Sequence, residues 1–348
     1  MPEVWYAIVA LLLTAYVVLD GFDLGAGVLH LFVARREAER REVLAAIGPF
    51  WDGNEVWLLA SGASLLVAFP RALSAGVSGF YLAIFLVVWC LILRGISIEF
   101  RSHVTDRLWR GSWDCVFAAA SALLPVFLGV ALGNLLRGVP LSPDGWFTLT
   151  LFTDFSAHEP VGILDWYTAL VGLFALVVLA GHGGMFLAWK TAGDVRARSR
   201  AVGRRLLLGV TLLWPVVTLA TLRVNPQFFD ALLSRPVAWL LGAVALVGLA
   251  ITFTSLSRGE DLAAFCGSCA FVAGLSGATA ACAFPVLLRA TGGDALSLTA
   301  GNAGGDPAGL RTALVWFSIG MPLAVLYFVT VLRIHRGKAV PARDGEGY

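Results

Sequence analysis

Four acidic residues lie inside or at the start of apolar segments, where a charged side chain is costly. Asp20 and Asp23 stand three residues apart within the first apolar run, so a helix would present both on one face. Asp52 and Glu55 open the second apolar run, within the segment Pro49–Trp57. Because ionisable side chains at membrane depth are rare and mark ion or proton pathways, we expect these carboxyl groups to transfer protons.

A cation and an aromatic residue accompany these acids. Arg94 lies inside the third apolar run, five residues before Glu99, and Trp51 directly precedes Asp52. Since short connections join the first three runs, we expect Arg94 to neutralise an aspartate of the first or second run; its alternative is to extend toward the membrane surface. The acids have alternatives as well. Those of the first run could serve packing alone, and those of the second could cap a helix at the positive end of its dipole.

The composition sets the class of protein. The chain has 348 residues, of which 58% are hydrophobic and 14% charged, and its mean hydropathy is +0.81. A soluble domain carries about 25% charged residues, so these values predict a polytopic membrane protein. The segment from Val4 onward lacks a basic start and a cleavage site, and we expect it to be a retained helix. The formal net charge of +2 gives no case for nucleic-acid binding.

Nine apolar segments are long enough to cross a bilayer as helices, which takes about 20 residues each. We therefore predict an all-α membrane protein with nine transmembrane helices, at about residues 4–33, 50–69, 77–98, 113–136, 163–189, 205–223, 237–256, 263–288 and 311–334. Four prolines fall inside these segments and predict local kinks, namely Pro125, Pro215, Pro285 and Pro322.

The distribution of lysine and arginine predicts the orientation. Of the 25 basic residues, 18 fall on the side of the C-terminus, 6 fall on the opposite side, and Arg94 lies within a helix. Because short cytoplasmic connections carry the excess of positive charge, we place the N-terminus outside and the C-terminus in the cytoplasm. The acids of the first three helices then lie in the cytoplasmic half of the membrane, so protons would be drawn from the cytoplasm.

The sequence shows no redox centre of its own. His182 is the only histidine deep in a predicted helix, and it lacks an obvious axial partner, so we interpret it as a packed polar side chain. Cys266 and Cys269 have CxxC spacing without a following histidine, which excludes a c-type haem attachment and favours a helix interface of small residues. We predict no metal ligands in this chain.

Six motifs in the first 136 residues resemble subunit II of the cytochrome bd quinol oxidases. They occur in the family's order and spacing, at Leu19–Gly27, Pro49–Trp57, Ser78–Tyr81, Arg94–Arg101, Trp109–Asp114 and Gly133–Leu136. Beyond about residue 140 the resemblance is confined to hydropathy and to the glycine-rich fifth span. One position departs from some relatives, because Phe50 stands where they have histidine.

The resemblance implies a fold of two four-helix bundles and one peripheral helix. Residues 1–136 would form the first bundle, with the polar proton-path motifs, and residues 137–162 an outer loop. Residues 163–290 would form the second bundle, residues 291–338 an outer loop with the peripheral ninth helix, and residues 339–348 a cytoplasmic tail. The location implied is the prokaryotic cytoplasmic membrane.

The resemblance also implies a function. Subunit II binds no haem, supports a subunit I that carries haem b and haem d, and contributes to the delivery of cytoplasmic protons while quinol reduces oxygen to water. Some members hold a structural quinone, and small single-helix accessory subunits are further expected partners beside the lipid membrane and quinol. Asp52 matches the proton-path carboxylate, with Asp23 and Asp20 as second carboxylates, Arg94 as electrostatic partner, Trp51 as neighbour, and Glu55 and Glu99 as uptake groups.

Three other functions remain open on the sequence. A proton-coupled secondary transporter would show broken helices in both halves around a site at the membrane midplane, whereas these charges are confined to one half. A cytochrome with its own haem would need paired axial ligands. A purely structural assembly subunit would keep the same acids for packing alone.

Overall fold

The computed structural model describes residues 1–340, so residues 341–348 of the predicted tail lie outside the described residues. The described chain forms twelve α-helices, one short 3-10 helix at Asp294–Leu296, and a two-stranded antiparallel hairpin of β1 (Val286–Leu288) and β2 (Leu298–Thr299). The helices are α1 (Pro2–Val33), α2 (Glu37–Ile47), α3 (Trp51–Ala68), α4 (Pro70–Gly79), α5 (Tyr81–Arg101), α6 (Arg107–Arg137), α7 (Trp166–Lys190), α8 (Gly193–Val224), α9 (Pro226–Ser234), α10 (Pro236–Arg258), α11 (Asp261–Ala283) and α12 (Pro307–Ile334).

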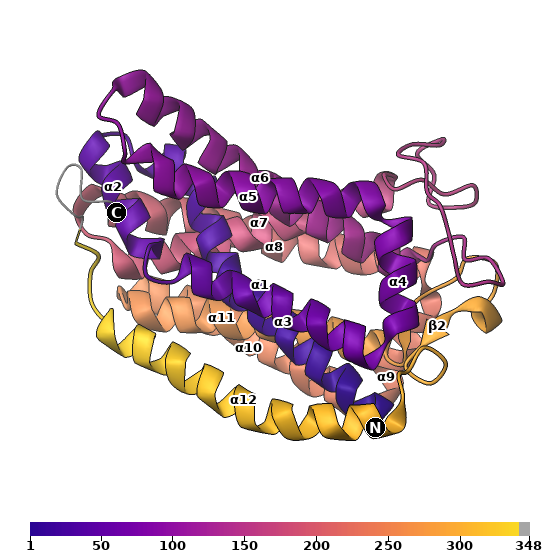
Figure 1. The fold of residues 1–348 in the computed structure, drawn as a ribbon. Coiled ribbons are helices and arrows are strands. Elements are labelled where there is room, and N and C mark those ends of the chain that lie inside the picture. Colours follow the sequence, from indigo (N-terminus) through magenta and orange to yellow (C-terminus); the bar gives the residue numbers. More distant parts are fainter. Residues whose placement is uncertain (341–348) are drawn as a thin grey trace.

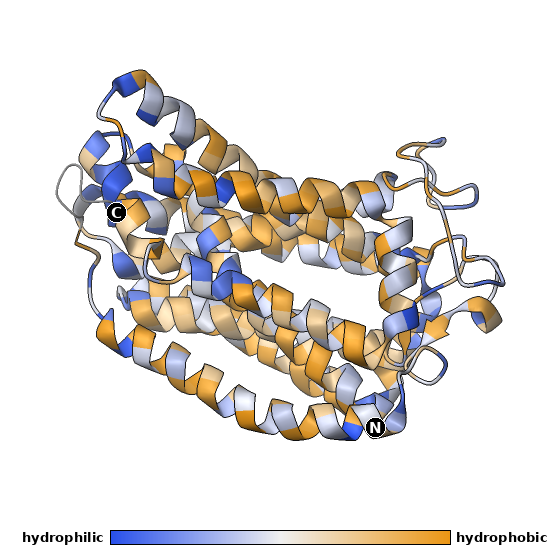
Figure 2. Cartoon of the chain, in the orientation of Figure 1, coloured by the Kyte–Doolittle hydropathy of each residue, from blue (hydrophilic) through white to orange (hydrophobic). Residues whose placement is uncertain are grey.

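Eight of the described helices are long and apolar enough to cross a membrane, and they run side by side through the molecule (Figure 1). They are α1, α5, α6, α7, α8, α10, α11 and α12. Apolar residues dominate their middle sections, and hydrophilic residues gather toward the ends (Figure 2). The chain is thus an all-helical membrane protein. Apart from these eight, α3 packs along α1 with 18 residues, but Asp52, Asn54 and Glu55 lower the hydropathy of its first turns.

The connections define two ends of the helix array. We call the end that carries α2 and the last described residues the α2 end, and the end that carries α4, α9 and the hairpin the α4 end (Figure 1). Polar caps set the helix boundaries at both. At the α2 end, Asp106 accepts hydrogen bonds from the backbone N–H groups of Leu108 and Trp109 and starts α6. At the α4 end, Asp165 caps α7 in the same way.

Glycines allow the backbones of α1 and α7 to approach each other closely. A Cβ at Gly25 would overlap the carbonyl oxygen of Leu179 and lie 2.7 Å from the nitrogen of Gly183. Helices can approach so closely only where side chains are absent, which explains the glycine-rich sequences of both segments. Because α1 also contacts α3, α6 and α11, it is the central helix that positions the polar side chains described below.

The structure corrects one predicted span and adds elements that hydropathy does not reveal. The helix predicted at 263–288 ends at Ala283, and Pro285 follows it in the loop before β1 rather than kinking a helix. Pro125, Pro215 and Pro322 do lie inside helices. The short helices α2, α4 and α9 lie largely between the predicted spans, and hydropathy does not reveal them because their 9 to 11 residues are too short to span a membrane.

The last long helix, α12, lies at the margin of the array (Figure 1). Aromatic contacts hold it, because Trp5 of α1 donates to the carbonyl of Leu310 at 3.2 Å and the rings of Trp57 and Phe328 are 5.1 Å apart. After α12 the chain turns back onto the end of α7. There Lys190 donates to the carbonyls of residues 335 and 337, and Lys338 donates to those of residues 188 and 189.

Candidate functional site

The site is built around an ion pair inside the helix array. Arg94 of α5 donates from Nη1 to Asp20 Oδ2 at 3.0 Å and from Nη2 to Asp20 Oδ1 at 2.5 Å. Both side chains are completely buried. The predicted pairing of Arg94 with an aspartate of the first or second helix is therefore present, and its partner is Asp20. A buried ion pair needs this bidentate geometry to offset the cost of removing both charges from water.

The second aspartate of α1 has a neutral partner instead. Asp23 Oδ2 accepts a hydrogen bond of 2.7 Å from the side-chain amide of Asn54 in α3, and Asn54 also donates to the carbonyl of Leu19. Asp23 is fully buried, and its Oδ1 atom has no hydrogen-bond partner among the described residues. An amide does not compensate a negative charge, so Asp23 is the carboxyl group of this cluster best suited to gain and lose a proton.

Glu55 completes the cluster from α3. Its Oε1 atom lies 3.5 Å from Arg94 Nη2, and its side chain is 22% exposed, so it stands between the buried pair and the surface of the chain. Trp57, two residues later, is buried, and its indole N–H has no hydrogen-bond partner among the described residues. Three carboxyl groups from two helices thus gather in the interior, and two of them, Asp20 and Glu55, lie beside the Arg94 guanidinium.

The other predicted site residues lie outside this cluster. Asp52 is exposed, because it stands two residues, and hence about 200°, from Asn54 around α3. Trp51 is partly buried, with its ring against Gly95 of α5. Glu99 is exposed near the end of α5. Within the chain itself, Asp52 is thus separated from Asp23 by the thickness of α3.

The sequence interpretation did not identify Asn54, and it singled out Asp114 only as part of the Trp109–Asp114 motif, without the buried cluster that Asp114 forms nearer the α2 end. Asp114 of α6 accepts hydrogen bonds from His30 Nε2 at 2.7 Å, Arg101 Nε at 2.5 Å and Arg40 Nη1 at 2.8 Å. His30 is fully buried and packs edge-on against the Phe117 ring, with 5.4 Å between ring centroids. The signal was available in the spacing, since His30 follows Asp23 by two helical turns on the same face of α1.

Ion pairs extend this second cluster to the surface. Arg101 donates to both carboxylate oxygens of Glu37 in α2, at 3.1 and 2.8 Å, and the Glu37 side chain is 38% exposed. A separate pair ties α2 to α8, where Glu39 meets Arg198 at 2.7 Å. Burial alone would raise the pKa of Glu39, but the backbone N–H of Arg35 and the guanidinium groups of Arg198 and Arg36 outweigh it and lower this pKa to about 2.

The deep histidine of α7 is held as a packing residue. His182 Nδ1 lies 2.7 Å from the Ser268 hydroxyl of α11, and Nε2 lies 3.0 Å from the carbonyl of Val18 in α1. Its ring stacks on Phe265 with 5.4 Å between centroids. Both ring nitrogens are engaged, which does not fit axial ligation of haem. Among residues 1–340, no group of three or more histidine, cysteine or acidic side chains is placed to hold a metal ion.

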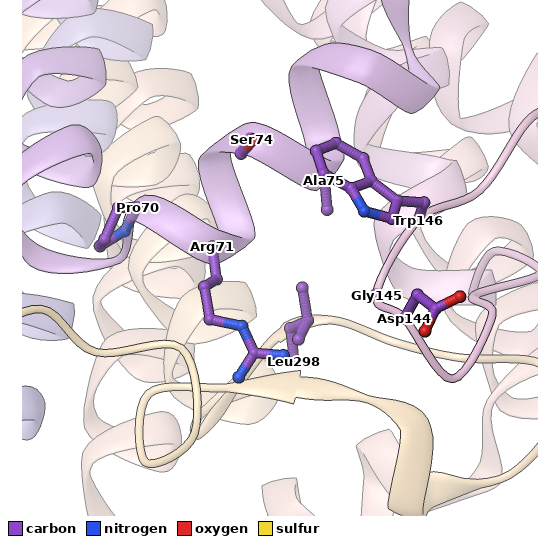
Figure 3. Close-up of a pocket in the computed structure, with 8 residues that line it drawn as sticks. All are labelled: Pro70, Arg71, Ser74, Ala75, Asp144, Gly145, Trp146 and Leu298. Carbon is purple, nitrogen blue, oxygen red and sulfur yellow. The ribbon is translucent and has the colours of Figure 1, made fainter.

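A surface cavity of about 300 Å³ lies at the α4 end, away from both clusters (Figure 3). Arg71 and Asp144 are its charged side chains, and Arg71 also donates to the carbonyl of Asn302. The remaining lining is small or apolar, from Pro70, Ser74, Ala75, Gly145, Trp146 and Leu298. This cavity offers no connected series of titratable groups, in contrast to the interior clusters.

The fold and the buried clusters define a polytopic helical membrane protein with ionisable side chains kept in its interior. Comparison with known proteins then gives its family. Residues 1–335 match the family model of the cytochrome bd terminal oxidase subunit II, and the chain belongs to that family.

Relatives and a solved structure agree with this assignment. The chain is 35% identical over 201 residues to cytochrome bd-I ubiquinol oxidase subunit 2 of Escherichia coli (strain K12), covering 58% of this chain and 52% of that protein. It is 33% identical over 208 residues to cytochrome bd ubiquinol oxidase subunit 2 of Bacillus subtilis (strain 168), covering 60% and 59%. The matched region thus spans little more than half of either relative.

The fold resembles that of the bd oxidase from Geobacillus thermodenitrificans. The TM-score is 0.76, and the superposition covers 96% of this chain and 98% of that chain at 19% sequence identity. The predicted family is therefore confirmed, and the likeness to the solved structure shows that the chain has the bd oxidase fold.

Proposed function

We propose that this chain is the haem-free subunit II of a bd-type quinol:oxygen oxidoreductase in a bacterial cytoplasmic membrane. It supports a subunit I that carries haem b and haem d, and it delivers cytoplasmic protons for the reduction of oxygen to water. The observation that carries the proton role is Asp23, a fully buried carboxyl group with an amide partner, beside the Asp20–Arg94 ion pair. The haems, and with them quinol oxidation, are assigned to the partner, since both ring nitrogens of the deep His182 are engaged.

The membrane topology belongs to the same proposal. We assign α3 as the ninth transmembrane helix, because its 18 residues extend about 27 Å and pack along α1. The α2 end, with its arginine-rich connections, faces the cytoplasm, and the N-terminus lies outside. The division into four-helix bundles at 1–136 and 163–290 with a peripheral α12 stays a prediction, since α1 contacts helices of both groups.

Within this proposal the carboxyl groups have different places. Asp23 and Asp20 lie in the interior, and Glu55 reaches from Arg94 toward the surface of α3. Asp52 is exposed on α3 one turn before Glu55, on the side away from Asn54, where a proton leaving this chain could pass to subunit I. Glu99 stands at the cytoplasmic end of α5 as an uptake group. The structural quinone and the accessory subunits of some family members are not supported by a described contact.

Replacement of Asp52 and Asp23 by asparagine tests the proton role in the intact two-subunit oxidase. Either change keeps the side-chain volume but removes the titratable group. We expect quinol-driven oxygen uptake to fall about tenfold or more with normal haem content, because a lost proton-transfer group costs about 100-fold where it is the only route. Asp194→Asn, at an exposed acid of the α2 end, is the control.

A purely structural role is the second candidate, favoured by the completeness of the Asp20–Arg94 pair. It predicts that the variants lose assembled complex rather than turnover per haem. Unchanged turnover in a fully assembled Asp52→Asn oxidase would remove Asp52 from the proton path, and the same result for Asp23→Asn as well would reject proton delivery by this cluster.

A further inference from the structure

Helix α1 carries one continuous polar stripe. Asp20, Asp23, Gly27 and His30 follow one another at intervals of three, four and three residues, which places them within an arc of about 80° on one face. Asp20 and Asp23 belong to the cluster at the centre of the proposed function. His30 lies seven residues nearer the end of α1, a distance of about 10.5 Å along the axis.

Helix α6 runs antiparallel to α1 along this stripe. Asp114 near its start meets His30 near the end of α1, at 2.7 Å. Two turns further along α6, Ser121 lies against Gly27, where a Cβ would overlap its hydroxyl group. Because Gly27 lies three residues from His30 and four from Asp23 along α1, the Ser121 hydroxyl against it lies at a depth between the histidine and the aspartate.

Three buried polar atoms along this line have no hydrogen-bond partner among the described residues. They are Asp23 Oδ1, Ser121 Oγ and His30 Nδ1, and all three side chains are fully buried. Buried polar atoms in native proteins are paired with protein groups or with ordered water. Three such atoms at successive depths between two helices therefore offer partners for bridging water along one line.

The outer end of this line reaches the surface through charged groups. Asp114 also binds Arg40, whose side chain is 29% exposed, and Arg101, which continues to Glu37. The charged and titratable groups that face His30 are therefore Asp114, Arg40 and Arg101, from three different helices. An imidazole in this place can accept a proton at one ring nitrogen and release one from the other.

We propose that Asp114, His30 and Ser121 form the cytoplasmic arm of the proton path and load Asp23. This inference rests on the proposed function. Exchange of the neutral ring from its Nε2–H to its Nδ1–H tautomer lets Nε2 accept a proton that has arrived on Asp114. The imidazolium then releases its Nδ1 proton, which passes through bridging water and the Ser121 hydroxyl to the Asp23 carboxylate. One proton has then moved from Asp114 to Asp23, and the ring is again the Nε2–H tautomer in which it started.

The test compares His30→Gln and Ser121→Ala with His103→Gln in the assembled oxidase. Glutamine can still donate to Asp114 but cannot carry a proton, and His103 is an exposed histidine on the same end. We expect His30→Gln to lower oxygen uptake about tenfold, to increase the solvent isotope effect, and to remove the part of the pH dependence of the rate that an imidazole causes. We expect Ser121→Ala also to increase the solvent isotope effect relative to the parent oxidase, but to leave the pH dependence of the rate unchanged.

The outcomes separate this inference from the proposed function. Normal turnover, isotope effect and pH profile in His30→Gln, together with slow turnover in Asp23→Asn, would overturn the histidine arm and leave Asp23 in place. Normal turnover in both would reject the proton role of the whole cluster. If the His30→Gln oxidase does not assemble, the Ser121→Ala variant tests the proposal, because it leaves the His30–Asp114 pair intact. An unchanged solvent isotope effect in Ser121→Ala would then overturn the proposed route through His30 and Ser121.

Discussion

Arg94 of α5 and Asp20 of α1 form two parallel hydrogen bonds in the apolar interior, although 74 residues separate them in the sequence. The pair fixes α5 at one depth relative to α1, and it also sets the charge of the site. One guanidinium is shared between a fully bonded carboxylate and Glu55 at 3.5 Å, while Asp23 depends on an amide. The arrangement thus gives three carboxyl groups three different environments.

Breaking this ion pair from one side should be more harmful than removing both partners. Arg94→Gln leaves Asp20 without its counter-charge, and we expect a loss of about 3–5 kcal/mol in the free energy of unfolding. The double variant Asp20→Asn/Arg94→Gln should lose less than the sum of the single changes, because neither charge then remains buried alone. Thermal unfolding of the purified complexes measures both, and strictly additive losses would contradict the coupling.

The contact between α1 and α7 depends on the absence of a side chain at Gly25. We expect Gly25→Ala to lower the free energy of unfolding by about 1–3 kcal/mol, because the added Cβ would overlap backbone atoms that cannot move aside. Gly242→Ala is the matched control, since no atom lies within 4 Å of its Cβ position. Equal thermal stability of the two variants would show that the helices separate without cost.

The link between α2 and α8 should depend on pH through Glu39. Its pKa of about 2 in the folded chain lies below the ordinary value of about 4.3, so the ionised form favours folding. This contribution is present above pH 4.3 and is lost as the pH falls toward 2. We expect Glu39→Gln to unfold at a lower temperature than the parent at pH 7, and the difference to shrink below pH 4. The exposed acid variant Glu3→Gln should show no such convergence.

The α4 end has its own buried ion pair, between Arg137 of α6 and Asp165 at the start of α7. Arg137 also donates to the carbonyl of Gly162 and to the side chain of Asn134. We expect Arg137→Gln to cost about 3–5 kcal/mol and to make the 138–165 connection more sensitive to protease. Arg223→Gln, at an exposed arginine on the same end, is the control. Equal rates of protease cleavage in the two variants would show that the Arg137–Asp165 ion pair does not hold this connection in place.

Hydropathy and helix length predicted the long helices well, because each must present about 20 apolar residues to lipid. Hydropathy and helix length were less accurate where contact with lipid does not determine where a helix ends. The helix expected to continue to residue 288 stops at Ala283, since the following Phe284-Pro285 begins an extended segment. The helix predicted at 50–69 is present as α3, although its polar first turns, with Asp52, Asn54 and Glu55, leave it outside the eight helices that are long and apolar enough to cross a membrane.

The site was predicted in composition and only partly in geometry. Asp20, Asp23 and Arg94 come together as the spacing and the short connections indicated. Asp52 and Asn54 could not be ranked from the sequence, because which face of α3 meets α1 is decided by packing. The pairing of His30 with Asp114 was hidden for the same reason, since the two residues are 84 positions apart in the sequence and meet only when α1 packs against α6.

The chain has two lysines, Lys190 at the end of α7 and Lys338 just after α12. Each donates to carbonyl groups in the segment that carries the other. No other side chain in the sequence carries a primary amine. Reagents that acylate amines therefore have two side-chain targets here, and both are engaged only while the end of α12 is docked. Slow acylation of both lysines would show that the end of α12 is docked on α7, and rapid acylation of both would show that it has been released. The measurement needs no substitution in the protein.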